Sequence, residues 1–525
     1  MLEKTSRASS AILLVIAINA MASCRSGMCE DARSPSNDNA TARPNILFIM
    51  SDDHTTQAIG AYGSRLARLN PTPNIDALAA GGMRFDRVFC NNSICTPSRA
   101  SIITGQYPQT NGVLDLTGNI PPPRQFLPIE MKKAGYQTAM IGKWHLKQEP
   151  AAFDYYCVLP GQGRYFDPTF RVRGDKAWPK NTIQKKGSHS SDAITDLSLE
   201  WLEKSWDRDR PFFLMHHFKA PHDMFQNAPR FETYLEDESI PEPSNLRDQP
   251  AAEFGSDASR GYGSGLAKGH EEWQLGRRLG IDQNLEDPEY TTQNYQKYLK
   301  RYLRCVKGVD GNVKRLVEFL RTEGELENTV IIYTGDQGFF LGEHDLMDKR
   351  WIYEEAMRMP FIVHYPAEVK QKSTNNWLIN NTDFAPTILE LAEVETPAYM
   401  QGRSFAPALR GEAKPADWRK ATYYRYWMHM AHNLRVPAHF GLRTDRYKLI
   451  FFYGTTPDGT NPTPVAWEFY DLKQDPQEMR NEYENPKYAA KIAELKAEMK
   501  KQRHQLRETD DDFPAVQKII DTHWN

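Results

Sequence analysis

Three uninterrupted runs of apolar or β-branched residues limit the folds open to this chain more than any other feature. They cover residues 45–50, 211–215 and 329–334, and polar residues follow each run closely. Because the runs do not alternate with polar residues, they are typical of strands buried on both faces of a parallel sheet. Helical spacing of apolar residues appears in 191–205 and again from 291 to 320. The sequence therefore predicts an α/β fold.

Acidic residues follow two of these strands. Asp52 and Asp53 come after the first run, and Asp336 with Gln337 comes after the third. Ligands of open α/β sheets bind beyond the carboxyl ends of the strands, so these side chains are candidates for one site. The set offers only oxygen donors, which favours Ca²⁺ over zinc or copper, and Mg²⁺, which needs a tighter octahedron, stays an alternative. By itself the Asp52–Asp53 pair also fits an Asx-type turn.

A cysteine stands at the start of a predicted helix in the stretch 95–105, Cys-Thr-Pro-Ser-Arg-Ala-Ser-Ile-Ile-Thr-Gly. The backbone donors of a helix N-terminus and the guanidinium of Arg99 would both face an anion bound there. The pattern therefore predicts that Cys95 is a reactive side chain beside an anion. The alternative is a buried, unreactive thiol next to a proline in the first helical turn.

Lysine and histidine are concentrated in two further stretches. A strand-like segment ends with Lys143 and His145, and residues i and i+2 of an extended chain share a face, so we expect both side chains in one pocket. Segment 216–222 holds three histidines, but their spacing is not that of a helical zinc pair. We interpret His216 and His217 as packing residues at a strand end.

Two of these stretches resemble the signatures of the type I sulfatase family. Residues 95–105 match Cys-x-Pro-Ser-Arg followed after four residues by Thr-Gly, and residues 135–145 match Gly-Tyr-x-Thr-x-x-x-Gly-Lys-Trp-His. The resemblance implies an alkaline phosphatase-like α/β fold: a large mixed, mostly parallel sheet flanked by helices, and a smaller C-terminal antiparallel sheet packed by a helix. It also implies that Cys95 is oxidised to formylglycine (3-oxoalanine) by a formylglycine-generating or anaerobic sulfatase-maturing enzyme.

The resemblance further implies roles for individual side chains. The catalytic residues would be Cys95, Arg99, Lys143, His145, His222 and Lys349. The ligands of a Ca²⁺ ion, or of Mg²⁺ as the second choice, would be Asp52, Asp53, Cys95, Asp336 and Gln337. Candidate substrate-binding residues are Lys219 and His344. The family commonly has Asp-Asn where this chain has Asp336–Gln337, and Gln337 keeps the amide oxygen on a side chain one methylene longer.

The expected substrate is a sulfated sugar. Residues 339–344 and 469–476 look most like those of bacterial sulfatases that act on glycans, such as N-acetylglucosamine-6-sulfatases. We therefore expect hydrolysis of the 6-O-sulfate of N-acetylglucosamine in glycosaminoglycan-type glycans. The alternatives are another sulfatase specificity (uronate 2-sulfate, glucosamine N-sulfate or choline sulfate), a phosphonate or phosphate monoesterase of the same fold, and an inactive exported glycan-binding protein.

Length and charge constrain the organisation of the chain. With 525 residues, a large domain plus a smaller one is expected: a catalytic domain at 44–410 and a C-terminal subdomain at 411–525. Hairpin-like strands near residues 440–452 and a charged amphipathic helix at 487–507 suit the smaller part. A formal net charge of −3 provides no global field for a polyanion, so we expect no nucleic acid partner, and local cations must bind an anionic substrate.

The first residues have the pattern of an export signal. Lys4 and Arg7 precede an apolar run at 11–18 that is too short to span a bilayer, and small residues follow. We expect a signal peptide at 1–23 and a polar tether at 24–43, hence a periplasmic protein or, with Cys24 lipidated, an outer-membrane-anchored lipoprotein. Ordinary cleavage after alanine is the alternative to lipidation. One disulfide could form among Cys90, Cys157 and Cys305.

Overall fold

The computed structural model describes residues 43–247, 254–508 and 510–524. Its largest element is an eleven-stranded sheet in the order β12-β2-β11-β8-β1-β7-β3-β4-β5-β6, with β13 also paired to β2. The central strands β8, β1, β7, β3 and β4 are parallel, whereas β11 on one side and β5 and β6 on the other are antiparallel to their neighbours. The strands are β1 Asn45–Asp52, β2 Met83–Phe89, β3 Gln137–Lys143, β4 Tyr155–Leu159, β5 Thr169–Val172, β6 Thr182–Gln184, β7 Phe212–Pro221, β8 Thr329–Gly335, β11 Arg358–His364, β12 Ser373–Asn375 and β13 Ile379–Asn380. The predicted large mixed, mostly parallel sheet is confirmed.

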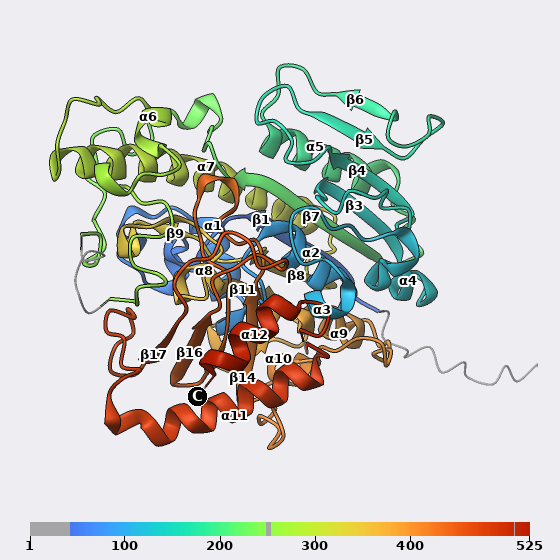
Figure 1. Ribbon diagram of the computed structural model, residues 1–525. Helices are drawn as coiled ribbons and strands as arrows, with labels where there is room; N and C mark the ends of the chain where they lie inside the picture. Colours follow the sequence, from blue (N-terminus) through green and yellow to red (C-terminus); the bar gives the residue numbers. More distant parts are fainter. Residues whose placement is uncertain (1–42, 248–253, 509, 525) are drawn as a thin grey trace, which may run out of the picture. The chain divides into compact units, whose positions relative to one another are not determined.

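The three apolar runs of the sequence form the three neighbouring strands β8, β1 and β7 at the middle of this sheet. Every residue of β1 is buried, because helices cover both faces of the sheet (Figure 1). Alternate residues of β1 therefore join different apolar clusters: Phe48 packs in the cluster of α2, α4 and α9, and Ile49 in that of α1, α5 and α7. The helices are α1 Pro73–Ala80, α2 Cys95–Thr104, α3 Pro108–Asn111, α4 Phe126–Lys133, α5 Ser190–Lys204, α6 Leu275–Leu279, α7 Glu289–Thr322, α8 Glu354–Met357, α9 Phe384–Leu391, α10 Ala406–Leu409, α11 Ala489–Gln505 and α12 Pro514–His523.

The long periodic segment after residue 289 is a single helix, α7. The segment contains Gly308 and Gly311, and glycine inside a helix costs about 1 kcal/mol relative to alanine, so its sequence also fits two shorter helices. Both glycines lie within the unbroken helix, whose apolar stripe is buried against the sheet. Tertiary burial therefore outweighs the local preference.

The C-terminal region contains a four-stranded antiparallel sheet in the order β14-β15-β16-β17, with bounds β14 Ala421–Tyr426, β15 His439–Thr444, β16 Tyr447–Phe452 and β17 Ala466–Asp471. One face packs against α11 and α12 through residues such as Phe440 and Phe451 (Figure 1). The other face contributes Tyr424 and Phe452 to the main core. The expected small antiparallel sheet with a covering helix is confirmed, and it is bound directly to the large sheet's core.

Long connections surround the sheet. Residues 225–247 and 254–288 contain short helices and otherwise irregular chain, and a short hairpin of β9 Phe340–Leu341 and β10 Met347–Asp348 follows β8. Within the described ranges, Cys90, Cys157 and Cys305 are free, buried thiols.

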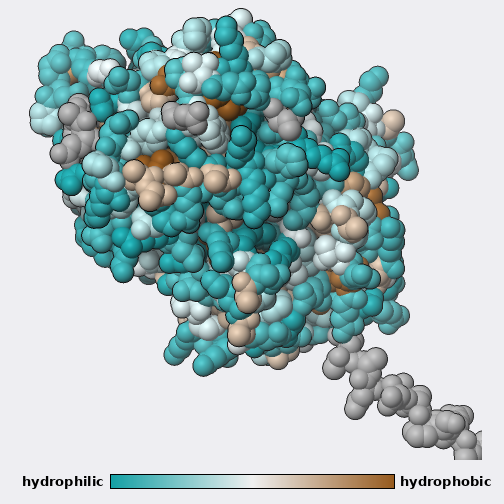
Figure 2. Space-filling model, turned by 60° about the horizontal axis from the view of Figure 1, so that its bottom comes forward, coloured by the Kyte–Doolittle hydropathy of each residue, from teal (hydrophilic) through white to brown (hydrophobic). Residues whose placement is uncertain are grey.

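None of the helices in the described part of the chain is long and apolar enough to cross a membrane. The face shown in Figure 2 is mostly hydrophilic, with small scattered apolar patches. The predicted leader and Cys24 lie outside the described residues.

Candidate active site

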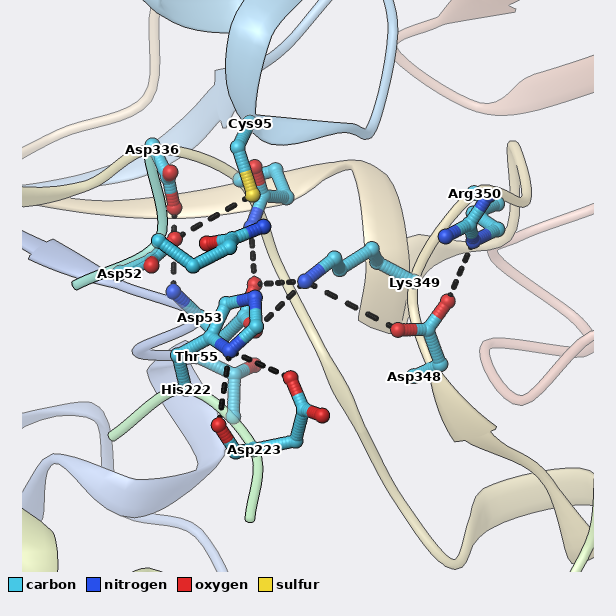
Figure 3. Close-up of polar contacts among 12 residues, drawn as sticks. Asp52, Asp53, Thr55, Cys95, His222, Asp223, Asp336, Asp348, Lys349 and Arg350 are labelled. Atoms are coloured by element: carbon cyan, nitrogen blue, oxygen red, sulfur yellow. Dashed lines mark hydrogen bonds and ion pairs between the residues drawn. The ribbon is translucent and has the colours of Figure 1, made fainter. Parts of the chain in front are cut away.

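The acidic residues that follow β1 and β8 lie together because these strands are parallel neighbours with Ser51 opposite Gly335. Carboxylate oxygens of Asp52, Asp53 and Asp336 all lie within 4.8 Å of one another, and all three residues are fully buried. The backbone N–H of Asp53 donates to Asp336 Oδ1 at 3.1 Å. Figure 3 shows the three side chains converging below Cys95. Strand order and register thus create one acidic cluster from two distant segments.

Electrostatics at this cluster favour a bound cation. Burial raises the pKa of Asp336 to about 7, and the negative charge of Asp52 adds to the rise. Burial also raises the pKa of Asp53, although the Lys349 ammonium opposes it. For Asp52, the positive charge of Lys143, together with that of other neighbours, outweighs the effect of burial and holds its pKa well below the usual value. A divalent cation would relieve the repulsion among the carboxylates.

Gln337 completes the set of oxygen donors. Its Nε2 donates to Asp53 Oδ1 at 2.5 Å, whereas its Oε1 is buried without a hydrogen-bond partner among the described residues. A buried carbonyl oxygen without a partner is costly, and a metal ion would satisfy it. The residues present therefore fit a hard divalent cation bound through oxygen.

Cys95 is the first residue of α2, and its Sγ lies 3.4 Å from Asp52 Oδ1 and 3.9 Å from Lys143 Nζ. Burial raises the pKa of the Cys95 thiol well above its ordinary value, and the Asp52 carboxylate adds to this. The side chain is therefore a protonated thiol at neutral pH, and a thiol is a poor nucleophile. The position suits a nucleophile, but the unmodified side chain does not.

Two cations lie beside Cys95. Arg99, one turn further along α2, donates from Nε to Asp336 Oδ2 at 3.0 Å and from a terminal nitrogen to the Lys143 carbonyl at 2.6 Å. Lys143, the last residue of β3, forms an ion pair with Asp52 and donates to Gln162 Oε1 at 2.5 Å. Both cations are buried. Together with the N-terminus of α2 they form an anion-binding corner.

The chain geometry at His145 differs from the expectation of a continuous extended segment. Strand β3 ends at Lys143, and His145 has a left-handed backbone with φ of 57°. The segment is therefore not extended through His145, and the premise of a shared face is wrong, although the Lys143 charge still acts on the His145 ring. Burial lowers the pKa of His145 to about 2, and the Lys143 ammonium adds to this. The imidazole is neutral, and its buried Nδ1 has no hydrogen-bond partner within the described ranges.

His222 and Lys349 both approach Asp53 (Figure 3). His222 Nε2 lies 3.8 Å from Asp53 Oδ2, and its Nδ1 contacts a carboxylate oxygen of Asp223. Asp223 thereby directs Nε2 towards the cluster. Lys349 Nζ lies 2.6 Å from both carboxylate oxygens of Asp53. The loop after β10 therefore brings Lys349 next to the end of β1.

The two candidate substrate-binding residues have different surroundings. Lys219 is buried, with Nζ 4.7 Å from the centre of the Tyr165 ring, and burial lowers its pKa to about 8, with Lys143 adding to the effect. His344 stacks on Phe254 at 4.4 Å. None of the contacts found in the described part of the chain joins His344 to the acidic cluster, so its role stays a prediction.

Sequence reasoning missed Gln162 and Asp223, which support this site, and interpreted His217, which also contacts it, as a packing residue. Gln162 accepts from Lys143, Asp223 pairs with His222, and His217 Nδ1 lies 3.1 Å from the Lys143 carbonyl and 3.5 Å from Arg99. Asp223 follows His222 directly, and that adjacency was a usable signal. Gln162 lies in a loop without any motif, so nothing in the sequence distinguishes it. His216, in contrast, packs away from the site and bonds to Ser198, as expected.

Comparison with known proteins decides the family. The Sulfatase family profile matches residues 44–394, and the profile of the N-sulphoglucosamine sulphohydrolase C-terminal region matches residues 342–505. The chain belongs to the sulfatase family. This sulfatase is accordingly a sulfuric ester hydrolase with an alkaline phosphatase-like fold, as the signatures of its sequence implied.

Individual relatives of this sulfatase are similar over most of their length. An N-acetylglucosamine-6-O-sulfatase from Bacteroides thetaiotaomicron is 38% identical, with 96% of this chain and 92% of the relative covered. The human N-acetylglucosamine-6-sulfatase is 28% identical over 74% of this chain and 68% of its own. A solved structure described as a complex with its substrate D-glucosamine-2-N,6-O-disulfate has a TM-score of 0.80 and 38% identity, and the match covers 90% of this chain and 99% of that one.

Proposed function

We propose that this sulfatase hydrolyses the 6-O-sulfate of N-acetylglucosamine in glycosaminoglycan-type glycans. The observation that carries the proposal is the convergence of Cys95, Arg99 and Lys143 on the acidic cluster at the N-terminus of α2. The substrate is supported by the names of the Bacteroides and human relatives, and by the 6-O-sulfate on the sugar bound in the related structure.

The charges of the site support an anionic substrate. Asp52, Asp53 and Asp336 carry three negative charges when ionised, and Arg99, Lys143 and Lys349 carry three positive charges, so this set is neutral by itself. A divalent cation would leave an excess of positive charge in a buried place. A sulfate ester would offset that excess, and a neutral sugar would not.

The chemistry needs two groups beyond the unmodified chain. Cys95 would carry the formylglycine made by a formylglycine-generating or anaerobic sulfatase-maturing enzyme, and the hydrate of that group would supply one hydroxyl for attack on sulfur and a second for release of the sulfate. Asp52, Asp53, Asp336 and Gln337, with the oxidised Cys95 side chain as a further ligand, would hold Ca²⁺, which would supply positive charge for the sulfate oxygens. The raised pKa of the Cys95 thiol makes the unmodified side chain a poor nucleophile, so the proposed reaction depends on the modification.

The remaining side chains bind the sulfate and move protons. Arg99 and Lys143 neutralise sulfate charge as it develops on the oxygens. His145, whose buried Nδ1 has no partner among the described residues, is the proposed base that deprotonates the hydrate hemiacetal, and the negative charge of a bound sulfate would raise its lowered pKa. His222, directed by Asp223, donates a proton to the leaving sugar oxygen, and the Lys349 charge stabilises that oxygen.

Sulfate release from a matched set of sugars tests the proposal. The set has sulfate on O6 of N-acetylglucosamine, on O6 of N-acetylgalactosamine, on O2 of a uronate or on the glucosamine nitrogen, with choline sulfate and the 6-phosphate of N-acetylglucosamine added. We expect release from the first sugar and none from it with Cys95→Ala. Release mainly from another sulfate ester would replace the substrate, and preference for the phosphate would favour a phosphomonoesterase. Tight binding without turnover by matured protein would indicate a glycan-binding protein.

We also propose that the protein is exported to the periplasm, with Cys24 as a lipid anchor in the outer membrane. The proposal is supported by the charged start, the short apolar run 11–18 and the small residues before Cys24. A sulfated glycan from outside the cell would reach the enzyme there.

A further inference from the structure

Two segments that carry proposed catalytic residues lie against each other. The residues before α2 lead into Cys95, and the residues after β10 contain Lys349. The backbone N–H of Arg350 donates to the Ser93 carbonyl at 3.0 Å, and Ser93 Oγ donates to the Trp351 carbonyl at 3.2 Å. The nucleophile and the cation for the leaving group therefore stand one or two residues from a direct contact between these segments.

A tyrosine from the C-terminal sheet joins both segments. The Tyr424 hydroxyl accepts from the Ser93 backbone N–H at 3.2 Å and donates to the Arg350 carbonyl at 2.7 Å. Tyr424 is fully buried on β14, and its ring stacks on His439 at 5.6 Å with the planes 18° apart. A single hydroxyl thus accepts a hydrogen bond from one active-site segment and donates one to the other.

We propose that Tyr424 is a positioning residue that sets the separation between the nucleophile at Cys95 and the Lys349 ammonium. The inference rests on the proposed roles of these two residues. Strand β14 holds Tyr424 in place. The next residue on this strand, Arg425, also donates its backbone N–H to the Asn91 carbonyl at 3.0 Å. The C-terminal sheet is therefore part of the active-site framework, although it supplies none of the proposed catalytic side chains.

Removal of the Tyr424 hydroxyl takes one hydrogen-bond partner from each of two buried backbone groups. The Ser93 N–H loses the acceptor it has in the described structure, and the Arg350 carbonyl loses a donor. Water cannot reach them without a shift of one segment. A displacement of about 1 Å in a catalytic group can reduce turnover about 100-fold. Burial raises the pKa of Tyr424 well above its ordinary value, so the phenol keeps the proton that it donates.

The neighbouring residue provides a matched control. Tyr423 is also buried on β14, but it faces α11 and α12, and its hydroxyl donates to Glu508. Tyr423→Phe and Tyr424→Phe therefore remove the same group from adjacent positions on opposite faces of one strand. Only the second change cuts the link between the active-site segments.

The test compares both variants with the parent enzyme after mass spectrometry has measured the formylglycine content of each. The readout is the ratio of kcat/KM on the sugar 6-sulfate to kcat/KM on 4-nitrophenyl sulfate, because this ratio does not depend on the fraction of active protein. Since the activated aryl sulfate needs little help from Lys349, we expect Tyr424→Phe to lower the ratio at least about 10-fold and Tyr423→Phe to leave it unchanged. Equal ratios in the two variants would overturn the inference.

Hydrogen exchange supplies a readout that does not need turnover. The Ser93 amide is expected to exchange at least about 10-fold faster in Tyr424→Phe than in Tyr423→Phe, since its acceptor is lost. Unchanged exchange at Ser93 would overturn the inference even if activity fell. If the parent enzyme released no sulfate from any ester, the proposed function would fail, while the exchange result would still decide whether the hydroxyl holds the two segments together.

Discussion

Lys349 Nζ lies 2.6 Å from each carboxylate oxygen of Asp53, so the loop after β10 and the end of β1 share a buried ion pair. Burial lowers the pKa of Lys349, but the charges of Asp53 and other neighbours outweigh this and hold it well above the ordinary value. The ammonium is thus a fixed positive charge, better suited to stabilise a leaving oxygen than to donate a proton. His222, whose Nε2 lies 3.8 Å from Asp53 Oδ2, is therefore the residue that we propose as the proton donor.

Leaving-group dependence should separate these two side chains from the rest of the site. We expect Lys349→Ala and His222→Ala each to lower kcat about 100-fold on the sugar sulfate, and less than about 10-fold on 4-nitrophenyl sulfate, because a good leaving group needs little stabilisation. Lys314→Ala removes an exposed lysine from α7 and serves as the control. An equal loss on both esters would contradict the assignment.

If Cys95 provides the nucleophile, activity should depend on this one of the four buried cysteines that the structure describes. Cys95→Ala should lower sulfate release by at least about 1,000-fold, since no other group replaces the attacking hydroxyl. Cys157→Ala removes a buried free thiol from β4 and should leave kcat within about threefold of the parent value. Mass spectrometry of the active enzyme should find the mass of formylglycine in the Cys95 peptide, and an unmodified thiol in fully active protein would contradict the mechanism.

The metal site predicts stabilisation by Ca²⁺. At a free concentration 100 times the dissociation constant, the ion should add about 2.7 kcal/mol to the free energy of unfolding. Gln337→Leu keeps the volume and removes the amide oxygen that lacks a partner, so we expect the affinity for Ca²⁺ to fall at least about tenfold. Calcium-dependent shifts in Tm measure both effects. A Gln337→Leu enzyme that binds Ca²⁺ normally would exclude Gln337 as a ligand.

Buried histidines predict acid sensitivity. Burial lowers the pKa of His344 to about 3, with the Lys448 charge adding to this, and burial lowers the pKa of His439 to about 3. The unfolded chain has an imidazole pKa near 6.5, so below that pH the unfolded state binds more protons. The contribution of the two neutral imidazoles to the free energy of unfolding is fully present above pH 6.5 and is lost as the pH falls towards 3.

Each imidazole should cost about 1.4 kcal/mol of unfolding free energy per pH unit below 6.5. We expect His344→Phe, whose ring can keep the stack on Phe254, to reduce the slope of stability against pH by one proton between pH 6 and 5. His523→Gln, at an exposed position of α12, is the control. Urea unfolding at several pH values measures the slope, and parallel curves for His344→Phe and the parent would refute the expectation.

The export proposal predicts a covalent lipid on Cys24. Metabolic labelling with palmitate should mark the parent protein and not Cys24→Ser, and the parent should fractionate with the outer membrane. Labelling that persists in Cys24→Ser would contradict the anchor, and soluble periplasmic protein without any label would favour ordinary cleavage.

Local sequence patterns were enough to predict many residues of this site. Asp52, Asp53 and Asp336 were predictable as one cluster, because parallel neighbouring strands place their carboxyl ends at the same edge. The resemblance placed Cys95 and Arg99 in a single helix turn, where backbone geometry leaves little freedom. The single α7 and the left-handed His145 were not predictable, since burial against the sheet and the end of β3 override local preference.

The sequence alone determined the strand-forming runs, the oxygen-rich strand ends and the motif residues, because periodicity and short signatures are local properties of a chain. Only the tertiary structure decided that Gln162 contacts Lys143, that Asp223 directs His222, and that the Tyr424 hydroxyl joins the two active-site segments. The Tyr424 contacts depend on strand order and packing, which bring Ser93 and Tyr424, more than 300 positions apart, within hydrogen-bonding distance. Burial then gives such contacts their strength, since water cannot replace a lost partner there.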